Sequence, residues 1–127
     1  MEISNHYWLI AALVCGFTAF LHLIAGHYEP IKPFMASDTP AMRKGTLYAC
    51  WHMVTVVLFG SAIALLSAAL GQGSALLVLF ISVLFLLFGL LFLLIAIGFS
   101  PKRNPFFLPQ WTLLLPIGGL GLLGLQQ

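Results

Sequence analysis

Apolar stretches long enough to cross a lipid bilayer constrain this chain more than any other feature of its sequence. The plainest runs from about residue 74 to 99 and contains no charged side chain. A spanning helix takes about 20 mostly apolar residues, and the chain is 61% hydrophobic and only 6% charged. Soluble globular domains carry roughly 25% charged residues. We therefore predict an all-α integral membrane protein, a four-transmembrane-helix bundle with short loops, formed as one domain by residues 1–127.

The predicted helices cover about residues 7–26, 44–70, 74–99 and 106–125, and a surface loop covers 28–43. Three prolines in that loop argue against a continuous helix, and Ser4 or Asn5 is expected to cap the first helix. Small residues recur along one face of each helix, which favours close packing between membrane helices. These predicted packing faces comprise Ala12, Cys15 or Gly16, Ala19, His22 and Gly26; Gly45, Ala49, His52, Val56, Gly60, Ala64 and Ser67; Ala75, Ser82, Gly89 and Ala96; and Gly118, Gly119, Gly121 and Gly124.

The distribution of positive charge predicts the orientation of the bundle. All five Lys and Arg residues fall in or beside the first and third loops. The positive-inside rule then places loops 28–43 and 100–105 in the cytoplasm and both termini on the non-cytoplasmic side. The N-terminus lacks the positive charge of a signal peptide, so we expect the first helix to be retained. The two short cationic runs are too small to follow a nucleic acid backbone, so we expect a lipid bilayer and no nucleic acid as partner.

Two histidines lie within predicted spanning helices, where an ionisable side chain is costly and marks a functional site by default. His22 and His52 are expected roughly 6 to 11 Å inside the cytoplasmic end of their helices, at 1.5 Å per residue, so they can meet. His27 and Glu29 are expected at the mouth of this region. Gln110 approaches from the start of the fourth helix.

Imidazoles converging from two helices, with carboxylates and an amide nearby, match the ligand preferences of several transition metals. We therefore predict His22, His27 and His52 as metal ligands, with Glu29, Asp38 and Gln110 as additional ligands or proton partners. The metal would be zinc, copper or iron, or the iron of haem b with His22 and His52 as axial ligands. The predicted function is a small protein that holds this metal or haem near the cytoplasmic face, for metal handling or redox chemistry.

Two other functions remain open at this point. In a homo-oligomer, the histidines could relay protons or contact a solute as part of a transport subunit. In an accessory structural subunit of a larger membrane complex, His22 and His52 would serve packing through interhelical hydrogen bonds. An enzyme is less favoured, because Cys50 and His52 lie two residues apart and do not face each other on a helix.

The order of features along the chain indicates a cellular location. A histidine pair closes the first span, a proline-bearing loop follows, and Trp-His lies early in the second span. This pattern resembles small bacterial membrane proteins, and the resemblance implies the bacterial inner membrane.

Overall fold

The computed structural model describes residues 2–127 and is helical throughout its ordered elements. Three helices are long and apolar enough to span a membrane, by length and composition: His6–Ala36, Ala41–Ala69 and Ala75–Phe99. A fourth apolar helix is shorter. The main helices are α1 (His6–Gly26), α3 (Ala41–Ala69), α4 (Ala75–Phe99) and α5 (Trp111–Gly124). The short elements are a π-helical turn (His27–Ile31), α2 (Lys32–Ala36) and a 3-10 turn (Pro105–Phe107).

The prediction of a surface loop over residues 28–43 is wrong for most of that range. The π-helical turn and α2 extend the first span to Ala36, and only 37–40 connects it to α3. The extended backbone of Glu29 interrupts the helix, with φ of −149° and ψ of 109°. Pro33 then lies in the first turn of α2, where a missing backbone N–H costs nothing. Prolines thus restart the helix here and do not abolish it.

The fourth helix is shorter than the predicted span over 106–125. It begins at Trp111, because Pro109 inside the first turns of a longer helix would remove a backbone donor. The stretch before it forms the 3-10 turn, and the Trp111 indole N–H donates to the carbonyl of Pro105 at 2.8 Å. At 1.5 Å per residue, α5 is about 21 Å long, less than the roughly 30 Å hydrocarbon core of a bilayer.

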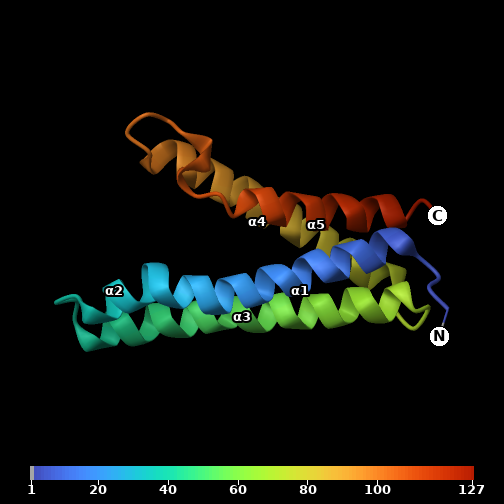
Figure 1. The fold of residues 1–127 in the computed structure, drawn as a ribbon, viewed down its shortest axis with the longest axis horizontal. Helices are drawn as coiled ribbons and strands as arrows, with labels where there is room; N and C mark the ends of the chain where they lie inside the picture. Colours follow the sequence, from blue (N-terminus) through green and yellow to red (C-terminus); the bar gives the residue numbers. More distant parts are fainter. Residues whose placement is uncertain (1) are drawn as a thin grey trace.

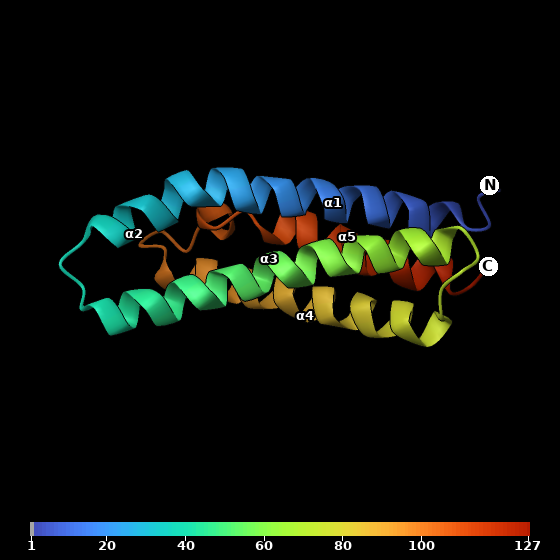
Figure 2. The ribbon, with the colours of Figure 1, turned by 90° about the horizontal axis from the view of Figure 1, so that it is seen from below.

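The helices form two hairpins, α1 with α3 and α4 with α5, which are joined mainly where α5 packs on α1. Figure 1 shows the hairpins close together at the end that bears both termini and diverging toward the other end. The view from below places the connection between α2 and α3 and the segment before α5 toward that second end (Figure 2). We call these the terminus end and the loop end.

Polar contacts tie three helices together at the terminus end. Asn5 caps α1 by accepting from the Trp8 N–H at 3.1 Å, and its amide donates to the carbonyl of Gly124 at 2.8 Å. The Trp8 indole donates to the carbonyl of Gly121 at 3.1 Å, and the Ser4 hydroxyl donates to that of Ala69 at 2.9 Å. The prediction of an N-cap at this position is confirmed for Asn5.

The small-residue faces predicted for α1, α4 and α5 are confirmed at most of their positions. Ala12, Cys15 and Ala19 are buried in α1, and Ser82, Gly89 and Ala96 are buried in α4. In α5, Gly118, Gly121 and Gly124 are buried, and an added methyl at any of them would overlap a neighbouring helix. These residues let the backbones approach closely, as membrane helices require.

The packing face predicted for α3 is wrong. Gly45 and Gly60 are exposed, with open space where a Cβ would lie. The buried residues are instead Leu58, Ser61, Leu65, Ala68 and Ala69. The buried face of α3 thus lies about one residue further along the helix than predicted, or about 100° around its axis. On this face, Leu58 and Leu65 fill space beside small side chains of α1 such as Cys15, whose thiol contacts the carbonyl of Leu58 at 3.3 Å.

Candidate functional site

His22 joins the two helices of the first hairpin. Its Nε2 lies 3.1 Å from the carbonyl oxygen of Trp51. A carbonyl only accepts, so Nε2 carries the hydrogen and donates it. The imidazole also stacks on the Trp51 indole, with ring centroids 4.8 Å apart and an interplanar angle of 28°. The absence of a side chain at Gly26 leaves room for this indole, since a Cβ there would lie 3.3 Å from its Nε1.

His52 lies beside the same indole. Its ring meets Trp51 nearly edge-on, with centroids 4.7 Å apart, and meets Tyr48 edge-on at 4.5 Å. Tyr48 and Trp51 are themselves parallel, with centroids 6.0 Å apart. We call His22, Tyr48, Trp51 and His52 the His–Trp cluster. Both histidines contact Trp51, so the cluster brings together the two histidines that the sequence placed at one depth.

The carbonyl of Trp51 serves more than one donor. The Thr55 hydroxyl, one turn further along α3, also donates to it, at 3.3 Å. The Thr55 hydroxyl bonds back one turn along its own helix, as threonines in helices often do, so the Nε2–H of His22 is the donor that links the two helices. Nε2 of His22 and the Thr55 hydroxyl thus each have an acceptor inside an otherwise apolar hairpin, where an unsatisfied group would be costly.

The other predicted ligands are dispersed. His27, Glu29, Asp38 and Gln110 are all exposed, and Gln110 lies on the other hairpin at the start of α5. His27 contacts the neighbouring Tyr28. Because the backbone stays helical at His27, five residues place it about 140° around the axis from His22. Within residues 2–127, no three His, Cys, Asp or Glu side chains are grouped so that they could hold a metal ion.

Reasoning from the sequence assigned no role to Tyr48 or Trp51. Their signal was present, since residues 48, 51 and 52 carry aromatic rings at helical spacings that place neighbours on one surface. Trp51 contributes both its ring and its backbone carbonyl to the cluster. The residue that brings the two histidines together is thus the tryptophan between them.

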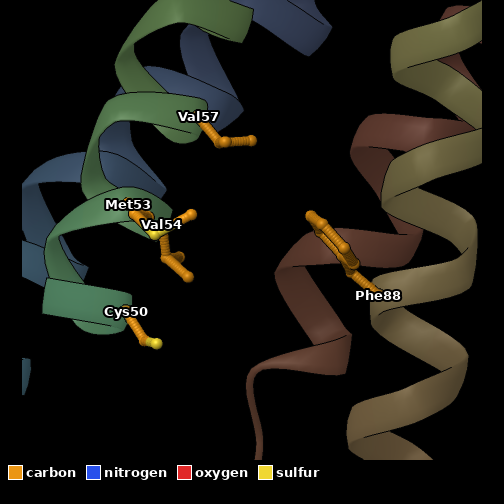
Figure 3. A pocket seen from close by; sticks show the side chains of 5 residues that line it. All are labelled: Cys50, Met53, Val54, Val57 and Phe88. Carbon is orange, nitrogen blue, oxygen red and sulfur yellow. The ribbon is translucent and has the colours of Figure 1, made fainter. Parts of the chain in front are cut away.

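A separate apolar pocket lies between the hairpins on the loop-end side of their contact. It has a volume of about 240 Å³ and is lined by Cys50, Met53, Val54 and Val57 of α3 and by Phe88 of α4. Figure 3 shows the side chains of α3 on one wall and the Phe88 ring facing them across the space. A second pocket, about 210 Å³, is formed on α1 by Phe17, Phe20, Leu21, Ile24 and Ala25. Neither of these pockets is lined by a histidine.

Comparison with protein family models, with curated proteins and with solved structures gives no match. The chemistry of the chain is therefore inferred from the geometry of the His–Trp cluster and of the pocket between the hairpins.

Proposed function

We propose that this chain is an accessory structural subunit of a larger membrane complex, in which His22 and His52 serve helix packing. The observation that carries the proposal is the double contact of His22 with Trp51, a hydrogen bond to its carbonyl and a stack on its ring. A side chain that is already paired in this way fixes the hairpin α1–α3. The outward apolar side chains of the hairpins then remain available to lipid and to partner helices.

The proposed setting is the bacterial inner membrane, with the loop end in the cytoplasm and both termini on the other side. Its support is the charge distribution, since all five Lys and Arg residues belong to segments 32–44 and 102–103, and these segments lie toward the loop end. Positively charged loops are retained in the cytoplasm.

The accessory role is tested by photocrosslinking in native membranes, with a photoreactive amino acid placed at outward positions. Ile63, Phe80 and Leu94 are 65%, 64% and 59% exposed and sample α3 and two levels of α4. We expect one of these positions to form a discrete adduct of constant mass with a single protein. The exposed loop residue Asn104 serves as the control position. Adducts with lipid alone at every position, or adducts of only twice the mass of this chain, would contradict the accessory role.

A second candidate function is the holding of a transition metal, and the shared contact of His22 and His52 with Trp51 favours it. The residues fit a haem poorly, because axial ligation through Nε2 of His22 requires loss of its bond to the Trp51 carbonyl. A metal ion would instead use Nδ1 of His22 and a ring nitrogen of His52. Two imidazoles are fewer than the three or four protein ligands of most zinc sites, so further ligands would have to come from outside the cluster.

Two substitutions of His22 separate packing from metal binding. His22→Phe keeps a ring on Trp51 but loses the N–H donor, and His22→Gln keeps a donor but loses the stack. Each should lower the free energy of unfolding in detergent by about 1 kcal/mol, the size of interhelical polar contacts in membranes. His6→Gln, at an exposed position outside the cluster, should leave it unchanged.

Elemental mass spectrometry of untagged protein supplies the other half of this test. Under the packing role, the wild-type chain carries less than about a tenth of an equivalent of iron, copper, zinc or nickel. About one equivalent of a single metal, lost in both His22→Phe and His52→Ala, would reject the packing role in favour of metal holding.

A further inference from the structure

We propose that the pocket between the hairpins holds an acyl chain of an anionic phospholipid of the bilayer, with the headgroup at the loop end. The pocket residues Cys50, Met53, Val54, Val57 and Phe88 are called the hairpin cleft. This inference does not depend on the accessory role, because it concerns the molecule that fills the space between the two hairpins of this chain.

The hairpin cleft continues the packing face of α3. Residues 50, 54, 57, 61, 65 and 68 follow one another at intervals of three or four, so they share one side of the helix. Toward the terminus end, Ser61, Leu65 and Ala68 are buried. Toward the loop end, Cys50 and Val54 are exposed, because the second hairpin has diverged from the first (Figure 1). An apolar face that begins as a helix interface therefore ends as one wall of an opening.

The chemistry of the lining selects hydrocarbon as the occupant. Its side chains are aliphatic, aromatic or sulfur-containing, and its exposed surface is almost entirely apolar. Water enters a cavity stably only where it finds two or more polar partners. In a bilayer, the available apolar filler is a lipid tail, which contacts both Val57 and the Phe88 ring across the space.

The depth of the cleft matches a lipid tail whose headgroup lies beside the start of α3. Cys50 and Val57 come nine and sixteen residues after Ala41, the first residue of the helix. At 1.5 Å per residue they lie about 14 and 24 Å along the axis. The whole helix of 29 residues is about 43 Å long, which exceeds the roughly 30 Å hydrocarbon core. Its first turns therefore reach the headgroup region, and the cleft lies beneath them.

Charge at the loop end selects an anionic headgroup. Five Lys and Arg side chains belong to segments at this end, against two carboxylates, Glu29 and Asp38. The Lys44 ammonium is engaged with the carbonyl of Met35 at 2.7 Å. The remaining cations are exposed: Lys32, Arg43, Lys102 and Arg103. Basic side chains beside a membrane helix attract anionic headgroups, and these come from both hairpins that border the cleft.

The test is native mass spectrometry of the purified full chain, with phosphatidylglycerol or phosphatidylcholine of identical acyl chains added in detergent. Val57→Trp fills the cleft. Val56→Trp makes the same change at the adjacent residue, which is 72% exposed and outside the cleft. The double variant Arg43→Gln/Lys102→Gln removes one cation from each hairpin and leaves the lining intact. Circular dichroism verifies that each variant is folded.

We expect the wild-type chain to retain one phosphatidylglycerol in at least fivefold excess over phosphatidylcholine. Val57→Trp should reduce the retained fraction at least fivefold, and Val56→Trp should leave it unchanged. The double charge variant should retain a lipid but lose most of the preference for phosphatidylglycerol. Equal retention of both lipids by the wild-type chain, or undiminished retention by Val57→Trp, would overturn the proposal. So would a wild-type dimer that only Val57→Trp dissociates, because a second copy would then occupy the cleft.

Discussion

Gly121→Ala should destabilise the bundle by about 1–3 kcal/mol, the usual cost of overpacking a well-packed core. An added Cβ at Gly121 would overlap the hydroxyl oxygen of Ser82 and lie 3.1 Å from its Cβ. The contact joins α5 to α4, and the carbonyl of the same glycine accepts the indole N–H of Trp8. A shift of α5 away from α4 would therefore also disturb its contact with α1. Unfolding of the purified protein in a detergent titration measures the loss.

Two further variants identify the cause. Gly119→Ala makes the same change two residues away, where a Cβ meets open space. It should be neutral or stabilising, because alanine is the better helix former. Ser82→Ala in the Gly121→Ala background removes the overlapping oxygen and should restore at least half of the lost stability, a coupling expected of residues in contact. If Gly119→Ala is as harmful as Gly121→Ala, the close approach of α4 and α5 is not the reason.

Asn5→Ala should cost about 2 kcal/mol, because it removes two hydrogen bonds of different kinds. The cap on Trp8 N–H is worth about 1 kcal/mol, and a typical net hydrogen bond such as that to the Gly124 carbonyl is worth about 0.5–1.5 kcal/mol. Asn5 is buried, so water does not replace the lost partners. The same detergent titration measures the free energy of unfolding.

Asn5→Ser separates the two contributions, since its hydroxyl can cap α1 but is too short to reach Gly124. About half of the loss should remain. Asn104→Ala is the matched control: Asn104 caps the 3-10 turn by accepting from the Phe106 N–H at 2.9 Å, but it is exposed. Its replacement should cost less than 1 kcal/mol. A loss at Asn5 no larger than that at Asn104 would show that the link from α1 to α5 contributes little.

The helical class, three of the spans and the close-packing faces of α1, α4 and α5 could be predicted from the sequence. Length and hydropathy set the spans, and small residues such as Ser82 and Gly121 identify surfaces where backbones approach. The face of α3 could not be predicted in this way. In an apolar helix, the lipid-facing and buried sides carry similar residues. The line of small residues through Gly45 and Gly60 therefore did not indicate which side of α3 faces α1. The face that α3 buries combines Leu58 and Leu65 with small residues, Ser61, Ala68 and Ala69, that lie about one residue further along the helix.

The sequence pointed to His22 and His52 on neighbouring helices, but not to their depth or their contacts. The expected depth of roughly 6 to 11 Å is too small, because the first span continues to Ala36 and α3 begins at Ala41. At 1.5 Å per residue, His22 lies about 21 Å and His52 about 16 Å from these ends. Their relation to each other depends on the rotation of α1 against α3, which brings His22 onto the ring and carbonyl of Trp51. His27, also predicted as a ligand, could face the same point as His22 only if the helix ended or unwound at Gly26, because five residues turn an ideal helix by about 140°. It continues there, and the third histidine points elsewhere.

The polar contacts at the terminus end also determine when the bundle can close during biosynthesis. Asn5 and Trp8 of the first helix bind the carbonyls of Gly124 and Gly121 in the last. The hairpin α1–α3, with its own bond from His22 to Trp51, can assemble as soon as α3 has left the ribosome. The contacts of Asn5 and Trp8 must wait for α5, so the buried Asn5 amide and the half-buried Trp8 indole N–H stay without their native acceptors until residues 121–124 have been inserted.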